Sequence, residues 1–162
     1  MNEPPIHADF EKSSWHDCRI WSIEFLVGDS DEDDWTSDLA FGIDYIVEWI
    51  CGAEGGTKFR VAPARLVFHG VTDPTIKLDW GSSGFQVAPC DLTIDRIARG
   101  PVRDQKVYLH RCYYHWTVEL HPPVCGSIEF GAVDFSQSLL AEPIVSDRQY
   151  FSLRERSRLT GR

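Results

Sequence analysis

In the stretch LAFGIDYIVEW (residues 39–49), large apolar side chains fall at every second position. A period of two places alternate side chains on opposite faces of an extended strand, so that one face can be buried. The stretch also fits a helical stripe, which consists of Ile43, Ile46, Val47 and Ile50. We favour a strand, because β-branched and aromatic residues dominate and Phe41, Tyr45 and Trp49 would then share the buried face.

Similar alternation, interrupted by turn residues, recurs along the chain. The expected strands are Arg19–Val27, Leu39–Cys51, Lys58–Ala62, Ala64–His69, Thr75–Trp80, Asp91–Ala98, Lys106–His121 and Ser127–Phe135. Pro63 separates two of them, since proline cannot donate to a ladder and marks an edge or a bulge. In 106–121 the apolar face changes midway, which predicts a bulge there. The sequence therefore predicts an all-β fold: a single-domain antiparallel β-sandwich or flattened barrel of about 8–10 strands.

The alternation also predicts which side chains form the core. We expect Ile128 and Phe130 to point inward, together with six further residues: Phe41, Tyr45, Trp49, Trp116, Val118 and Leu120. The chain of 162 residues is long enough to bury such a core as one domain. We assign residues 1–14 to an irregular N-terminal segment, 15–150 to the β-domain and 151–162 to an Arg-rich C-terminal tail.

The formal net charge is −9, which argues against a nucleic-acid partner. Residues 1–57 hold 14 acidic side chains against Lys12 and Arg19, whereas residues 58–162 hold 11 acidic and 14 basic side chains. One interpretation is that both surfaces are solvated and compensate each other within the fold. The other is an acidic face that is presented to a basic partner. The C-terminal arginines could form a disordered tail or dock on the acidic first half.

The five cysteines, Cys18, Cys51, Cys90, Cys112 and Cys125, are odd in number and form no CxxC motif. The first twenty residues are polar and acidic, unlike a signal peptide, and no apolar run reaches membrane-spanning length. We therefore expect a cytoplasmic protein that does not bind membranes, with five reduced thiols. Burial as small hydrophobic side chains is the ordinary expectation for such cysteines.

Two parts of the sequence resemble a known type of domain. The opening WHDCRI (residues 15–20) is similar to that of several uncharacterised bacterial families in which a Trp-His-Asp turn leads into the first strand. DYI (44–46), FRVAPA (59–64), VFH (67–69) and VTD (71–73) resemble one such domain of unknown function. The resemblance covers about the first half of the chain and implies a small bacterial cytosolic β-domain. Such domains sometimes accompany toxin–immunity systems, and the resemblance supplies no catalytic residue.

Histidine and cysteine side chains give the best metal candidates in the sequence. His110, Cys112 and His115 are followed by His121 and Cys125, and neutral imidazole and thiolate are the ligands that zinc prefers. Residues 110 and 112 would share one face of a strand, but the spacing matches no zinc finger or ribbon. We therefore assign no metal and no cofactor, and keep these residues as candidates.

Two further motifs allow a structural or a functional interpretation. His16-Asp17 could brace the turn before the first strand through hydrogen bonds, or form a dyad, for which the sequence offers no nucleophile. Asp29, Asp31 and Asp33 resemble the first ligands of a calcium loop. However, Asp34 stands where the EF-hand requires glycine and Ala40 where it requires glutamate, so an EF-hand is excluded.

These observations favour a non-catalytic module of immunity-like or similar type that binds a basic protein through an acidic surface. The predicted partner-binding residues are Asp29, Asp31, Glu32, Asp33, Asp34 and Trp35, with the tryptophan as anchor. The alternative is a domain with an aromatic-lined pocket that binds a small ligand or carbohydrate, or acts as a small enzyme. The sequence does not indicate an oligomeric state.

Overall fold

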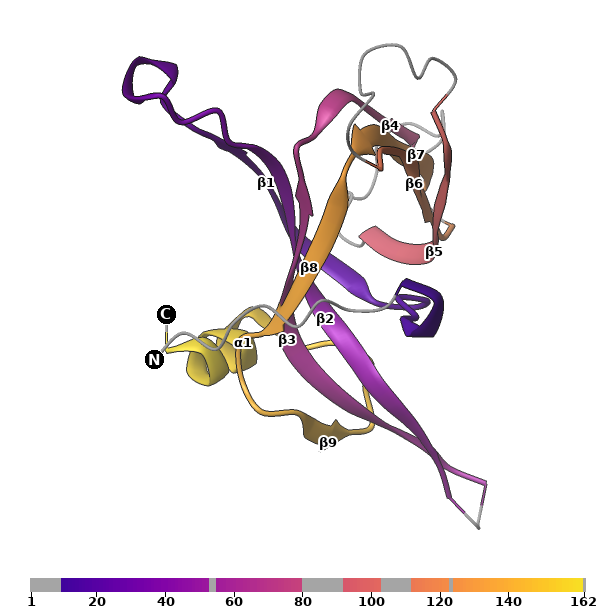
Figure 1. The fold of residues 1–162 in the computed structure, drawn as a ribbon. Helices are drawn as coiled ribbons and strands as arrows, with labels where there is room; N and C mark the ends of the chain where they lie inside the picture. Colours follow the sequence, from indigo (N-terminus) through magenta and orange to yellow (C-terminus); the bar gives the residue numbers. More distant parts are fainter. Residues whose placement is uncertain (1–9, 53–54, 80–91, 103–111, 123, 162) are drawn as a thin grey trace.

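The computed structural model describes residues 10–52, 55–79, 92–102, 112–122 and 124–161 (Figure 1). The strands are β1 (Arg19–Val27), β2 (Ser37–Cys51), β3 (Thr57–His69), β4 (Thr72–Asp79), β5 (Leu92–Pro101), β6 (Tyr114–Leu120), β7 (Cys125–Ala132), β8 (Asp134–Leu139) and β9 (Ile144–Ser146). Two 3-10 turns, Phe10–Lys12 and Ser30–Glu32, and the helix α1 (Leu153–Thr160) complete the described elements. No described helix is long and apolar enough to cross a membrane.

The nine strands form one antiparallel sheet, so the predicted all-β class is confirmed. The strand order is β4-β7-β6-β5-β1-β2-β3-β8, with β9 paired to β3. Within the described residues the sheet is not closed, so the flattened barrel is not found. Among the described residues, only two pairs, Arg19–Thr93 and Ile20–Leu92, join β1 to β5. The sheet therefore consists of two halves, β4-β7-β6-β5 and β1-β2-β3-β8, joined at a narrow seam.

Aromatic side chains from both halves meet in the core. The Phe68 ring of β3 lies 5.0 Å from the Trp116 ring of β6 and 4.8 Å from the Phe130 ring of β7, measured between centroids. Phe135 of β8 lies 5.7 Å from Trp116. All four side chains are buried. Burial of these large rings against one another holds the inner faces of the two halves together.

The predicted core is confirmed at most positions. Phe41, Trp116, Val118, Leu120, Ile128 and Phe130 are buried, and Tyr45 is half-buried against the core. Trp49 is 48% exposed, so its predicted burial is wrong. A register shift between Ile46 and Glu48 adds one residue to β2, which moves Trp49 to the face opposite Tyr45. There its ring packs against Phe59 at 5.0 Å.

Pro63 does not break its strand, because β3 runs continuously from Thr57 to His69. The Pro63 carbonyl accepts a hydrogen bond from Leu140, just beyond β8. Since the N–H and C=O of one strand residue point the same way, the missing proline N–H faces the gap between the β8 and β9 pairings, where no ladder bond is lost. The expected strand Ser127–Phe135 is instead two strands, because β7 ends at Ala132 and β8 begins at Asp134.

The C-terminal segment forms the helix α1, and a capping box stabilises the N-terminus of this helix. Ser152 Oγ accepts from the Glu155 N–H, and the Glu155 carboxylate accepts from the Ser152 N–H. Arg156 of this helix donates two hydrogen bonds, of 3.1 and 2.7 Å, to the fully buried carboxylate of Asp44 in β2. The sequence left open whether the C-terminal arginines form a disordered tail or dock on the acidic first half of the chain. Arg156 docks there, because its hydrogen bonds to Asp44 hold the helix on that half.

The cysteines differ in burial. Cys18, Cys51, Cys112 and Cys125 are all free, but only Cys18 is buried, so burial was wrongly expected for the other three. Burial raises the pKa of the Cys18 thiol to about 12, which keeps it protonated. Cys90 lies outside the described residues, as do Trp80 and the bulge expected midway in 106–121.

Candidate functional site

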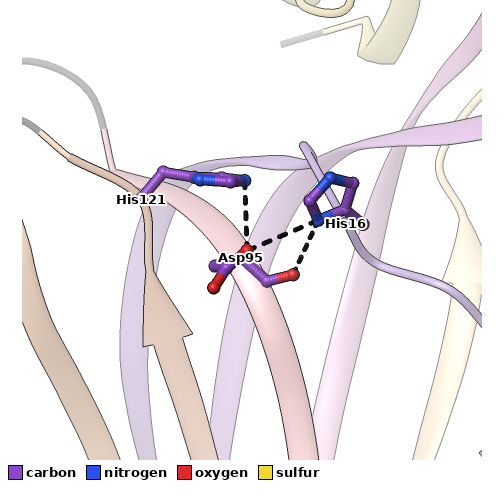
Figure 2. A group of neighbouring side chains, drawn as sticks. All are labelled: His16, Asp95 and His121. Carbon is purple, nitrogen blue, oxygen red and sulfur yellow. Dashed lines mark hydrogen bonds and ion pairs between the residues drawn. The ribbon is translucent and has the colours of Figure 1, made fainter.

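Two histidines and two aspartates converge at the seam between the sheet halves. His16 and Asp17 belong to the turn that precedes β1, Asp95 lies in β5 and His121 follows β6. Figure 2 shows the Asp95 carboxylate between the two imidazole rings. We call these four residues the His–Asp cluster.

The backbone at the cluster departs from regular geometry at two of the four residues. Asp17 adopts the left-handed region at φ 64°, and its N–H donates to the carbonyl of Ile94 at 2.9 Å. The β5–β6 register shifts between Ile94 and Arg96, which leaves Asp95 as the extra residue of a bulge. Bulges and left-handed non-glycine residues are found often beside functional sites, because both redirect side chains.

The side chains of the cluster lie within ion-pair distance of one another. His121 Nε2 is 3.0 Å from Asp17 Oδ1 and 3.5 Å from Asp95 Oδ1. His16 Nδ1 is 2.8 Å from the Asp95 carbonyl oxygen and 3.6 Å from Asp95 Oδ1. His16 Nε2 lies 3.7 Å from Asp17 Oδ1, too far for the hydrogen bond that could have linked the neighbouring pair. Instead, Gln149 donates to Asp17 Oδ2 at 3.2 Å.

The cluster is open on one side and closed on the other. The side chains of His16 and Asp95 are about half exposed, whereas those of Asp17 and His121 are mostly covered. His121 Nε2 is buried and has no hydrogen-bond partner among the described residues, although it lies 3.0 Å from Asp17 Oδ1. A buried polar atom without a partner is uncommon and indicates a missing ligand or a functional role.

The predicted partner-binding residues lie elsewhere, at the end of the β1–β2 hairpin. This end projects away from the rest of the molecule (Figure 1). We call residues 25–38 the acidic arm. All six predicted residues are exposed there: Asp29, Asp31, Glu32, Asp33, Asp34 and Trp35. The structure brings them together, but it does not test their role.

The turn of the acidic arm is ordered by its own carboxylates. Asp29 accepts from the Asp31 N–H at 2.9 Å, and Asp34 accepts from the N–H and hydroxyl of Thr36. The hydrogen bonds from Thr36 lower the pKa of Asp34 from its ordinary value, so its negative charge persists to lower pH. Among the described parts of the chain, no Lys, Arg or His side chain forms an ion pair with the five acidic residues of the turn.

Within the described residues, the structure does not place the metal candidates from the sequence next to one another. Cys112 is exposed, and His115 lies on β6 with Nε2 3.5 Å from Glu129 Oε2. His110 lies outside the described residues.

The sequence did not predict the grouping of His16 with Asp95 and His121, since the three residues are far apart in sequence. One signal was present: the apolar positions step from Ile94 by three residues to Ile97, which is typical of a bulge at Asp95.

A third cluster has the atom pairing of a catalytic triad. His69 Nδ1 is 2.9 Å from Asp38 Oδ2, and His69 Nε2 is 2.8 Å from Ser136 Oγ. However, Ser136 is only 8% exposed and lies in the ladder of β8 opposite Val67. A nucleophile must reach its substrate, so we interpret these bonds as a tie between β2, β3 and the outer strand β8.

This interpretation predicts that a fluorophosphonate probe leaves Ser136 unlabelled. Ser136→Ala should lower the free energy of unfolding by about 1 kcal/mol, the usual loss for one hydrogen bond. Mass spectrometry of the probe-treated protein and a denaturant titration measure the two effects. Labelling at Ser136 that disappears in His69→Ala would instead identify a reactive triad.

The described residues enclose a pocket of a size that can hold a small ligand, as the alternative function would require. A pocket of about 580 Å³ is lined by Trp21, Phe151 and Arg156 among others, beside β1 and the start of α1. Trp21 Nε1 is buried and has no hydrogen-bond partner among the described residues. The lining also includes Leu78 of β4 and Leu92 of β5, so residues of both sheet halves contribute to this pocket, and the sequence-based alternative stays a prediction.

Comparison with protein-family models, with curated proteins and with solved structures finds no match to this chain. The resemblance to bacterial β-domains therefore remains an expectation from the sequence.

Proposed function

We propose that the protein is a binding module that inserts its acidic arm into a basic surface of another protein. The observation that carries this proposal is the set of exposed apolar side chains beside the acidic turn, whose carboxylates have no cationic partner among the described residues. Trp35 is 76% exposed, Val27 80% and Phe25 53%. Exposed large apolar residues that cluster beside charges are typical of protein-interaction sites.

The form of the arm also supports this function. Phe25 and Val27 lie two residues apart on β1, so they share one face of the hairpin. The turn that follows carries five carboxylates without a cationic partner in the described structure. A tryptophan supplies a rigid anchor for an apolar pocket, and the carboxylates complement lysine and arginine around such a pocket. The expected partner is therefore a protein with a basic rim around an apolar depression.

Photo-crosslinking from position 35 identifies such a partner. Trp35 is replaced with p-benzoylphenylalanine, and the protein is irradiated in an extract of the cells that make it. We expect a basic protein to be captured from position 35, because the side chain there is predicted to lie at the centre of the interface. The purified partner should then bind the unmodified protein, and excess Trp35→Ala should compete less well than wild type.

The matched control places the same photo-crosslinker at Val145. Val145 is likewise exposed, at 55%, but it lies on β9, away from the acidic arm. Equal products from both positions would show non-specific capture. If no product is specific to position 35, or if the captured protein binds Trp35→Ala and wild type equally, the proposed function is wrong.

A further inference from the structure

We propose that His16, Asp95 and His121 bind a divalent transition-metal ion, for which Zn²⁺ is the model, with Asp17 beside the ion. This proposal is independent of the acidic arm. One potential ligand atom from each of the three residues lies within 4.8 Å of the other two. Neutral imidazole and carboxylate are ligands of zinc, and imidazole favours such ions over magnesium or calcium.

The distances between the ligand atoms fit a coordination sphere. Around a tetrahedral ion with bonds of about 2.0–2.1 Å, neighbouring ligand atoms lie about 3.3–3.4 Å apart. His121 Nε2 is 3.5 Å and His16 Nδ1 is 3.6 Å from the shared ligand atom, Asp95 Oδ1. The ligand nitrogens of His16 and His121 lie within 4.8 Å of each other, so the side chains would have to close further around the ion.

The buried nitrogen of His121 is the second, independent observation. Its Nε2 is closed to solvent, makes no hydrogen bond within the described part of the chain and lies close to both Asp17 and Asp95. An ion bound between these groups would give the nitrogen the partner that it lacks.

His16 can offer Nδ1 as a ligand in only one of its two neutral tautomers, the one with the hydrogen on Nε2. A carbonyl only accepts hydrogen bonds, so the contact of Nδ1 with the Asp95 carbonyl places the hydrogen on Nδ1. Transfer of that hydrogen to Nε2 frees Nδ1 for the ion and places an N–H on Nε2, which lies 3.7 Å from Asp17 Oδ1. A ligating histidine whose other nitrogen faces a carboxylate is a common arrangement in metal sites.

The position of the site indicates that a bound ion would link the two halves of the sheet. Its ligands come from the turn before β1, from β5 and from the end of β6, on the two sides of the narrow seam. A bound ion would therefore tie the two halves of the sheet together where few backbone pairs do so. The half-exposed side of His16 and Asp95 leaves room for water as a further ligand.

Titration with Zn²⁺ alone tests the site. Calorimetry on the full-length, reduced protein should detect one ion per chain that is lost in Asp95→Asn, which keeps the side-chain shape and removes the charge. We expect the affinity of Asp95→Asn and His121→Ala to fall by at least about tenfold, since even outer-sphere partners contribute that much. Zn²⁺ should raise the melting temperature of wild type and not of these variants.

His115→Ala is the matched control, because His115 is an exposed histidine of β6 outside the cluster. It should bind Zn²⁺ as wild type does. If His121→Ala fails to fold, His16→Ala replaces it, since that side chain is 53% exposed. The proposal is overturned if wild type binds no Zn²⁺, or if binding and thermal stabilisation are the same in the cluster variants as in His115→Ala.

Discussion

Replacing Arg156 with alanine is expected to lower the free energy of unfolding by about 3–5 kcal/mol, the loss seen when one member of a buried ion pair is removed. The Asp44 carboxylate is completely buried, and the Arg156 guanidinium gives it two hydrogen bonds. Without Arg156, its remaining described hydrogen bond comes from the Phe151 N–H, at 3.1 Å. A buried charge with so little compensation is unstable, so α1 should detach and the whole domain should weaken.

Denaturant titrations of Arg156→Ala and Arg154→Ala measure this effect. Arg154 is exposed on the same helix, so its substitution changes charge and helix propensity equally but should leave stability nearly unchanged. The double variant Asp44→Asn/Arg156→Leu should be less destabilised than the sum of its single changes, because no charge stays buried. Equal stability of Arg156→Ala and Arg154→Ala would show that the pair does not hold the helix.

Trp116→Ala should also cost about 3–5 kcal/mol, as is usual when a large buried aromatic side chain is removed. The Trp116 ring is completely buried, contacts Phe68 and Phe135 across the core, and donates through Nε1 to the Ala132 carbonyl at 3.2 Å. The substitution leaves a cavity where the two sheet halves meet.

Trp35→Ala is the control for this prediction, because it removes the same side chain from an exposed position of the acidic arm. Its melting temperature should equal that of wild type. If Trp116→Ala does not fold, Trp116→Phe should still show a smaller loss, since it keeps most of the ring and loses the Nε1 hydrogen bond. A wild-type melting temperature for Trp116→Ala would remove this residue from the core.

Local alternation was sufficient to predict the strand class and most of the core. β1 begins and ends at the predicted residues, because its signal is contained in one short segment. Trp49 was assigned to the wrong face because a bulge shifts the parity of every later residue in a strand, and the sequence of β2 alone gives no sign of it.

The candidate sites differ in how far the sequence could predict them. The acidic arm was found because its residues are consecutive and charged. Asp95 and His16 are 79 residues apart, and Asp44 and Arg156 are 112 apart. Their meeting depends on the order of the strands, which the alternation of apolar residues does not specify. The narrow seam between β1 and β5, on which the His–Asp cluster depends, is likewise a property of the whole sheet.

The association rate of the captured partner, measured as a function of salt, tests whether the charges of the acidic arm guide binding. The arm variant is Asp31→Asn/Asp33→Asn/Asp34→Asn, and the control is Asp73→Asn/Glu142→Gln/Asp147→Asn, which removes the same charge from exposed positions outside the arm. If the arm binds a basic surface, the arm variant should keep the wild-type melting temperature but associate about tenfold more slowly at low salt, and this difference should shrink as salt screens the charges. The control should associate nearly as wild type does. Equal rates for the arm variant and the control at every salt concentration would show that the acidic arm does not bind the partner.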